Sequence, residues 1–251
     1  MPVVEPDAWR QYVAGFHSRR AGITEVVLEH AYDSNGLTAY DWAAQPVPAG
    51  RVVLDLACGS APMHSRLNAD TYVGLDLSAA ELAAAAARSL DVGLSDVARL
   101  PIADESVDVV VMSMALMLVP LGQSLREIRR VLRPGGLFVA TVPSSSPLPL
   151  RDWLRYTRLC LALRHLGLSY PNDAELTAAP TAFSAAGLTL ISDERRPFMC
   201  ELVDEHVAER LLASLYLPEV APARLAAGRR VVRRWAGSSV GTPIRRLVAH
   251  A

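Results

Sequence analysis

The 251-residue chain contains no lysine: all 25 of its basic residues are arginines, and 26 acidic residues leave a net charge of −1. A chain without a basic excess lacks the electrostatic signature of a nucleic-acid partner. The absence of lysine also excludes a P-loop, whose Gly-Lys-Ser/Thr ending places a lysine on the phosphates of a nucleotide. We therefore predict that the protein has no nucleic-acid partner and no P-loop site for a nucleoside triphosphate.

Cysteine and long apolar runs are also scarce. Cys58, Cys160 and Cys200 are odd in number and widely separated, so they predict neither a disulfide framework nor a metal site. The first residues carry two acids and no apolar core, unlike a signal peptide. No uninterrupted apolar run reaches the roughly 18 residues that a membrane helix needs. We expect a cytoplasmic protein without an integral membrane segment, either a monomer or a homodimer.

Short apolar segments alternate with helical patterns from residue 52 onward. Strands are expected at 52–57, 71–77, 92–94, 107–115 and 137–143, and again near residues 188–198 and 244–251. Strands that alternate with helices form βαβ units and hence a parallel sheet covered on both faces. The predicted fold is α/β: a doubly wound, Rossmann-like, seven-stranded and mostly parallel sheet.

Two segments depart from this alternation and divide the chain into three parts. Residues 1–50 predict an N-terminal helical cap in which SNGLTAYDW (34–42) is a loop. Residues 51–146 predict the ligand-binding half, and residues 147–251 a helical insertion followed by the last strands. The inserted helix, at about 151–168, is amphipathic and is expected to form a lid. We predict that the three parts form one domain, 1–251.

The turn after the first strand, in VVLDLACGSAP (52–62), is where a doubly wound fold binds its ligand. A dinucleotide site needs Gly-x-Gly-x-x-Gly so that backbone N–H groups can approach a pyrophosphate. Here Gly59 is the one glycine of the turn, Ala61 stands where a further glycine is usual, and Pro62 removes an N–H group. The turn is poorly suited to phosphate.

Asp76 ends the second strand, about 20 residues beyond the turn, where an acid binds the hydroxyl groups of a ribose. The sequence thus predicts a nucleoside site without a pyrophosphate cradle, which fits S-adenosylmethionine.

Four motifs, in order, resemble those of class I S-adenosylmethionine-dependent methyltransferases, in the group of small-molecule enzymes that resemble ubiquinone and menaquinone biosynthesis proteins. They are VLDLACGSA, YVGLDLS, SDVARLPIADESVDVVVMSMALMLV and LREIRRVLRPGGLFVATVP, between residues 52 and 143. The resemblance implies S-adenosyl-L-methionine as the cofactor and methyl transfer to oxygen, nitrogen or carbon.

The same resemblance implies which residues hold the cofactor. They are Asp55, Ala57, Cys58, Gly59, Asp76, Leu77, Asp96, Val97, Met112 and Ser113. Asp76 would accept hydrogen bonds from both ribose hydroxyls, Asp96 would accept one from the adenine amino group, and Asp55 would reach the methionyl amino group through water. No residue is implied as a metal ligand.

Candidates for a catalytic base lie in the helical additions: His17, Tyr40 and His165. Trp42 and Trp153 are candidates for the wall of an acceptor pocket, although core packing is the better explanation for both. The acceptor is expected to be a small apolar, aromatic or glycosidic molecule. Two alternatives stay open, a protein of this fold that binds S-adenosylmethionine without transferring its methyl group, and an RNA base methyltransferase.

Overall fold

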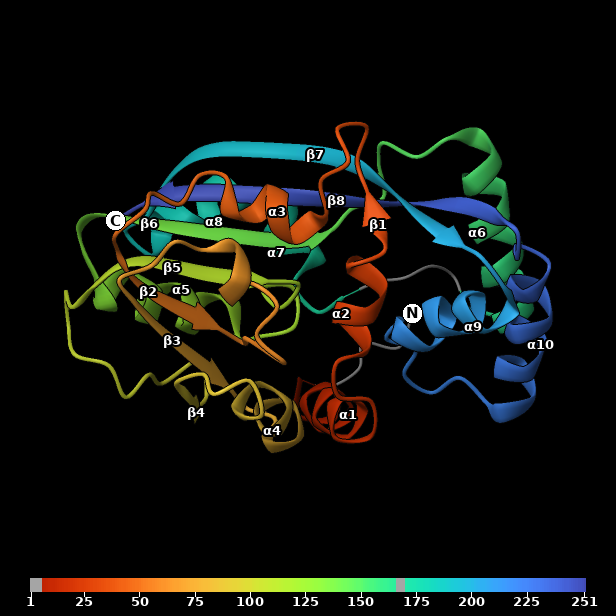
Figure 1. The fold of residues 1–251 in the computed structure, drawn as a ribbon, viewed down its shortest axis with the longest axis horizontal. Helices are drawn as coiled ribbons and strands as arrows, with labels where there is room; N and C mark the ends of the chain where they lie inside the picture. The colour runs from red at the N-terminus through yellow and green to blue at the C-terminus, as the bar shows by residue number, and fades with distance from the viewer. Residues whose placement is uncertain (1–5, 166–169) are drawn as a thin grey trace.

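A computed structural model describes residues 6–165 and 170–251 and shows one mixed β-sheet with helices on both faces (Figure 1). The strands follow the spatial order β1-β7-β8-β6-β5-β2-β3-β4. The predicted α/β fold is confirmed, and the sheet has eight strands because the two-residue strand β1 (Ala31–Tyr32) adds to the edge beside β7.

The centre of the sheet consists of five parallel strands. They are β2 (Val52–Leu56), β3 (Thr71–Asp76), β4 (Val92–Leu94), β5 (Val107–Ser113) and β6 (Leu132–Pro143). Strand β2 pairs with β3 on one side and with β5 on the other, so the strand order reverses at β2. The carboxyl ends of these three strands therefore meet at one edge, where a doubly wound sheet places its ligand.

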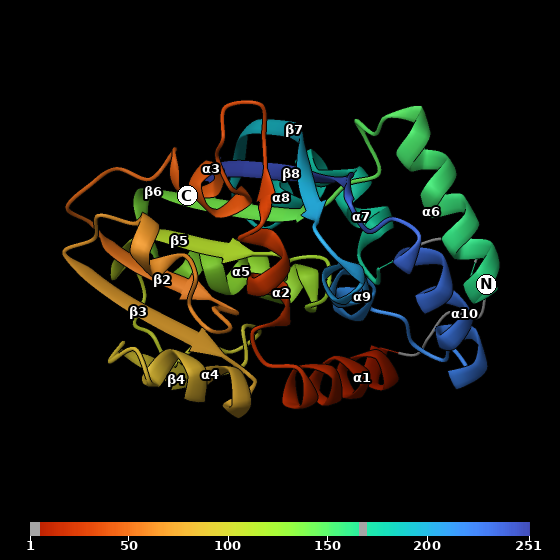
Figure 2. The ribbon, with the colours of Figure 1, turned by 45° about the vertical axis from the view of Figure 1, so that its right-hand side comes forward.

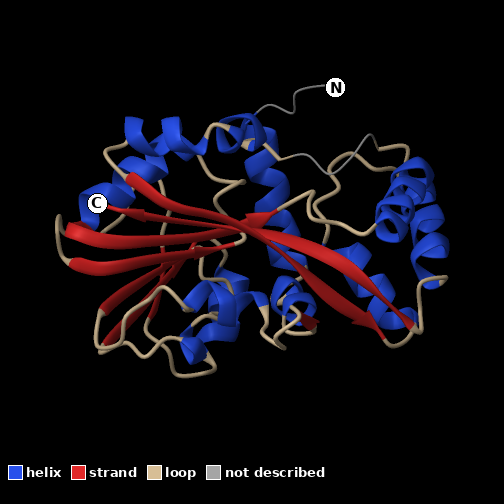
Figure 3. Ribbon diagram, turned by 90° about the horizontal axis from the view of Figure 1, so that it is seen from above, coloured by secondary structure: helices blue, strands red, loops and turns tan. Residues whose placement is uncertain are grey.

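Strands β7 (Thr189–Leu202) and β8 (Ser238–His250) are longer than the others and extend past the edge of the central sheet as a two-stranded arm (Figure 3). They pair with each other antiparallel along their whole length, and β8 also pairs antiparallel with β6. The arm carries the chain beyond the carboxyl ends of the parallel strands, on the side where a ligand would bind.

The central strands are buried on both faces, as their nearly continuous apolar sequences predict. In β5, Val110 and Met112 face one core while Val109 and Val111 face the other. The larger core includes α5 (Leu121–Val131) and α8 (Ala179–Ala185), where Phe183 stacks on Phe138 of β6. The short helix α7 (Asp173–Thr177) precedes α8.

The connection from β2 to β3 contains only the 3-10 turn His64–Arg66, not a full helix. The N-terminal helix α3 (Ala39–Ala44) packs against that turn. Helix α3 lies in a segment where the sequence analysis expects a loop. Its first turn is closed by a capping box, in which Thr38 accepts from the backbone of Asp41 and Asp41 accepts from the backbone of Thr38.

Helices α6 (Leu150–Leu163), α9 (Glu205–Ser214) and α10 (Pro222–Arg233) gather around the far end of the β7–β8 arm (Figure 1). We call these three helices the outer helical cluster. They share a second apolar core with the outer parts of β7 and β8. The carboxylate of Asp152, fully buried on α6, fixes the cluster to the arm by accepting a hydrogen bond from the Gly241 amide at 3.0 Å.

The N-terminal helix α1 (Pro6–Arg19) runs between the outer helical cluster and α4 (Ala79–Ala86), as Figure 2 shows. Helix α2 (Ile23–Leu28) then turns back toward α9. Helices α1 and α2 thus lie over the carboxyl edge of the sheet, whereas α6, the inserted helix that the sequence analysis expects to form a lid, contributes no residue to the cavity at that edge.

Candidate functional site

A cavity of about 390 Å³ lies at the carboxyl ends of β2, β3 and β5, where the strand order reverses. This volume is typical of small-molecule sites. Nine of the ten residues predicted to hold the cofactor line it: Asp55, Ala57, Cys58, Gly59, Asp76, Leu77, Asp96, Val97 and Ser113. The sequence therefore located the cavity, and the part played by each residue stays a prediction.

The turn after β2 forms the floor of this cavity and bends through left-handed backbone conformations. The φ angles of Ala57, Gly59 and Ala61 are 52°, 57° and 61°. Two of the three residues are alanines, which adopt this region at a cost of about 1–2 kcal/mol each. Backbone strain of this kind is found at ligand sites. Cys58 is buried and packs against Gly74, where an added Cβ would lie 2.9 Å from its Sγ atom.

Asp76 ends β3 and ties the turn to the next helix. Its Oδ2 accepts from the Gly59 amide at 2.8 Å and its Oδ1 accepts from the Ser78 amide at 2.7 Å. Burial raises the pKa of Asp76, while the two amides and the nearby His17 oppose that rise. An ionised carboxylate has about four lone-pair sites, so each oxygen of Asp76 can accept one further hydrogen bond from a ligand.

Asp55 lies in β2, beneath the turn, with only 1% of its surface exposed. The Tyr72 hydroxyl donates to its Oδ2 at 2.7 Å. Burial raises the pKa of Asp55 to about 7, the hydrogen bond from Tyr72 opposes the rise, and the Asp76 carboxylate adds to it. The carboxyl group is thus poised to change its charge near neutral pH.

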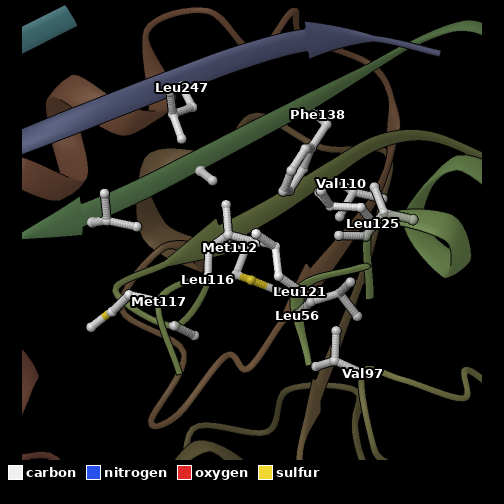
Figure 4. Packing of buried hydrophobic residues seen from close by; sticks show 14 of the residues in the cluster. Leu56, Val97, Val110, Met112, Leu116, Met117, Leu121, Leu125, Phe138 and Leu247 are labelled. Atoms are coloured by element: carbon white, nitrogen blue, oxygen red, sulfur yellow. The ribbon is translucent and has the colours of Figure 1, made fainter. Parts of the chain in front are cut away.

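The remaining cofactor residues differ in how they meet the cavity. Leu77 is 51% exposed and is available to cover a ligand, and Val97 is buried beside it in the wall. The carboxylate of Asp96 accepts hydrogen bonds from the Ala98 amide and from Arg10 of α1. An adenine amino group that donates to Asp96, as the sequence analysis expects, would therefore share this carboxylate with Arg10. Met112 does not line the cavity and instead points into the core, beside Leu116 and Leu121 (Figure 4).

The structure brings two of the three candidate bases to the cavity. His17 and Tyr40 line it, whereas His165, just beyond the end of α6, is not among the described residues that do. Trp42 is fully buried and Trp153 is exposed, and neither lines the cavity. Burial raises the pKa of Tyr40 well above its ordinary value, and the neighbouring Glu25 and Glu29 add to that rise.

A chain of three hydrogen-bonded side chains crosses one wall of the cavity. A hydrogen bond of 2.8 Å joins Nδ1 of His17 to the carboxyl group of Glu81. A second hydrogen bond of 2.8 Å joins Nε2 of His17 to the Tyr216 hydroxyl. Glu81 is 3% exposed, and its other oxygen accepts from the Gly22 amide at 2.9 Å. The sequence analysis missed Glu81 and Tyr216. An acid in the first turn of a helix has an ordinary explanation in the helix dipole, and Tyr216 stands in no motif.

The donor set fits S-adenosylmethionine better than a phosphate-bearing ligand. Five acids line the cavity, Glu25, Asp55, Asp76, Glu81 and Asp96, against the basic Arg10 and His17. A phosphate would be repelled by this arrangement, whereas a ribose and the cationic amino and sulfonium groups of the cofactor would be attracted. The reversal point of the sheet and this acidic cavity have the place and the charge that an S-adenosylmethionine site requires.

Comparison with known proteins agrees with a site of this kind. Residues 54–140 match the family model described as a methyltransferase domain, which spans β2 to β6. Residues 54–140 of this chain are therefore similar to a methyltransferase domain.

The curated relatives match over part of their length. The demethylmenaquinone methyltransferase of Mycolicibacterium paratuberculosis (strain ATCC BAA-968 / K-10) is 38% identical over 125 residues, 49% of this chain and 54% of that protein. That of Mycobacterium tuberculosis (strain ATCC 25618 / H37Rv) is 38% identical over 122 residues, 47% of this chain and 52% of that protein. The chain spans about half the length of these relatives.

Solved structures resemble the whole fold at lower identity. The [4+2]-cyclase SpnF has a TM-score of 0.61 at 21% identity, covering 95% of this chain and 94% of that one. An S-adenosylmethionine-dependent methyltransferase from Thermotoga maritima has a TM-score of 0.56 at 14% identity, covering 94% and 98%. At these identities the likeness shows the fold.

The raised pKa of Asp55 predicts a pH-dependent stability that Asp55→Asn removes. An unfolded aspartate titrates near pH ~4, so between about pH 4 and 7 the folded protein holds a proton that the unfolded chain has lost. The contribution of this group to the free energy of unfolding is therefore largest at low pH and decreases as the pH rises toward 7. Above about pH 7 it no longer changes with pH. Urea unfolding without cofactor should show the Asn variant gaining stability relative to wild type from pH 5 to 7, by about 2–3 kcal/mol. Asp91→Asn, at an exposed position, is the control. A stability difference that stays constant with pH would contradict the assignment.

Asp76→Asn should weaken S-adenosylmethionine binding by about 10- to 100-fold, the size expected for losing a hydrogen bond to a charged group. The amide keeps one acceptor oxygen but places an NH₂ group against the Gly59 or Ser78 amide. Isothermal titration calorimetry measures the effect, with Asp91→Asn as the matched control and NAD as a ligand expected not to bind. An unchanged affinity for S-adenosylmethionine in a folded variant would rule out Asp76 as the ribose acceptor.

Proposed function

We propose that this protein transfers the methyl group of S-adenosylmethionine to a small, largely apolar acceptor. The observation that carries the proposal is a single cavity with an acidic nucleoside side, at Asp76, and an apolar side beyond β5. In the proposed division, residues 51–146 hold the cofactor, and the segments 1–50 and 147–251 close the acceptor side.

The acidic lining supports a cationic cofactor. When bound, S-adenosylmethionine supplies an activated methyl group on a positively charged sulfur. The carboxylates of Asp55, Asp76 and Glu81 favour that charge in a partly enclosed site, where electrostatic interactions are stronger than in water. The same residues would hold a cofactor without this positive charge less strongly.

The acceptor side of the cavity is apolar. Met114, Ala115, Leu118 and Val119, which follow β5, line it. Such a wall excludes water and orients an apolar ring, and positioning can contribute up to about 7–11 kcal/mol to a transfer between two bound reactants. The name of the mycobacterial relatives, demethylmenaquinone methyltransferase, supports a quinone-type ring as the acceptor class.

An acceptor that must lose a proton has a route through the chain of three side chains. The Tyr216 hydroxyl lies on the cavity wall and can take the acceptor's proton while passing its own to Nε2 of His17. Glu81 holds the opposite ring nitrogen and stabilises the imidazolium that forms. Burial raises the pKa of both Tyr216 and Tyr40, so neither is ionised at rest; in this proposal Tyr216 relays a proton to His17, whereas Tyr40 donates a hydrogen bond to the bound reactants.

Methyl transfer must be measured directly, since a neighbour of the same fold is titled a cyclase and a fold does not fix a reaction. Purified protein is incubated with methyl-labelled S-adenosylmethionine and fractions of small molecules, RNA and protein. We expect label in a small apolar product, with hydroxylated quinones as the first defined acceptors. Label in RNA or protein alone would contradict the proposal, and cofactor binding without any labelled product would favour a non-catalytic protein.

His17→Gln and Tyr216→Phe should each lower kcat by about 10²- to 10⁴-fold, the usual contribution of a general base. Their affinity for S-adenosylmethionine should change less than threefold, because we assign them to the proton and not to the cofactor; this split distinguishes proton transfer from a merely structural role. His250→Gln, at the exposed end of β8, is the control. If either variant keeps full kcat on an acceptor that loses a proton, the route is wrong.

A further inference from the structure

Helix α6 is apolar on two opposite sides. Toward the protein it buries Leu159 and Leu163, which pack against Gly228 of α10. Away from the protein it exposes four large apolar side chains, Leu150 at 73%, Trp153 at 55%, Leu154 at 42% and Leu161 at 72%. Single exposed apolar residues need no explanation, but several on one helix mark a site of interaction.

The exposed residues form one stripe. Leu150, Leu154 and Leu161 are separated by four and seven residues, spacings that return to the same side of an α-helix. Trp153 is three residues after Leu150 and adjoins the same side. This stripe, which we call the α6 stripe, lies at the end of the molecule opposite the C-terminus, as Figure 3 shows for the outer helical cluster.

Arginines of α6 border the α6 stripe on one side. Arg158 lies four residues after Leu154 and three before Leu161, so it borders the stripe. The one acid of α6, Asp152, is buried, and α10 contains no acid. The arginines of the two helices are Arg151, Arg155, Arg158, Arg224, Arg229, Arg230 and Arg233.

Arg158 lies beside the stripe, whereas the arginines of α10 lie behind it, because α10 packs on the buried side of α6 through Gly228. Helices in contact have axes about 8–10 Å apart, which is within about one Debye length at physiological salt. Arg158, Arg229 and Arg230 form no ion pair among the residues that the structure describes, whereas Arg155 pairs with Asp152 and Arg233 pairs with Glu205 and Glu209 of α9. A chain of net charge −1 thus carries a strongly basic end.

We propose that the α6 stripe docks on an anionic lipid surface, with α6 lying in the plane of the headgroups. Tryptophan and leucine on one side of a helix and arginine beside them are the features of interfacial helices. No helix in the described part of the chain is long and apolar enough to cross a membrane, so the contact is peripheral. Two copies docked through this face would oppose their arginines, which disfavours self-association. The inference stands independently of the proposed reaction.

The protein carries its own reporter for this contact. Of its four tryptophans, Trp9, Trp42 and Trp235 are buried and Trp153 is exposed. Vesicles of phosphatidylcholine with about 30% phosphatidylglycerol should therefore shift the tryptophan emission to shorter wavelength and carry the protein through a sucrose gradient. Vesicles of phosphatidylcholine alone should bind much more weakly, and added salt should release the protein.

Two matched pairs of variants test the face. Leu161→Gln should weaken vesicle binding roughly tenfold, whereas Ile191→Gln, at an exposed position on β7, should not. Arg158→Gln should weaken it about fivefold, whereas Arg126→Gln on α5 should not. Circular dichroism verifies that each variant is folded.

Three results would overturn the proposal. The first is an unshifted emission with anionic vesicles at low salt. The second is equal binding by Leu161→Gln and Ile191→Gln. The third is a dimer in sedimentation velocity that Leu161→Gln converts to monomer, since the stripe would then be covered by a second copy.

Discussion

The carboxylate of Asp76 is the point on which the site depends. It accepts from the turn after β2, at Gly59, and from the start of α4, at Ser78. Because β2 and β3 are parallel neighbours, both groups reach the same edge of the sheet. The start of α4 in turn positions Glu81, and Glu81 holds His17 of α1. Asp76 thus positions the turn after β2 directly, and it positions α1 indirectly through α4. The turn and α1 therefore line the same cavity.

Charge is distributed very unevenly for a chain that is nearly neutral. Acids gather at the carboxyl edge, where burial raises the pKa of Asp55 and Asp76 and makes their charge sensitive to what binds beside them. Arginines gather on α6 and α10, at the other end of the β7–β8 arm. Net charge alone therefore says little about partners here. The separation provides one end that favours a cationic small molecule and another that favours an anionic surface.

Local patterns in the sequence identified the parallel strands, the turn and Asp76, because each is determined by neighbouring residues. The sequence also contained a signal for helix α3, because Thr38 and Asp41 have capping-box spacing. The Asn-Gly pair just before them favoured a loop instead. Met112 was placed on the wrong side of its strand, because an all-apolar strand does not reveal which face meets a ligand. The contact of His17 with Glu81 and Tyr216 spans 64 and 199 residues and leaves no local pattern.

The β7–β8 arm connects the part of the chain beyond the matched domain to the cavity. The family match ends in β6, and the arm begins in the part of the chain beyond it. The segment between α9 and α10 returns along the arm to place Tyr216 at the cavity, while α6, fixed to β8 through Asp152 and Gly241, presents its outward side to solvent. The second apolar core joins these helices to the cavity, because it contains Tyr40 and Met63, which line the cavity, as well as Leu159 of α6 and Leu211 of α9.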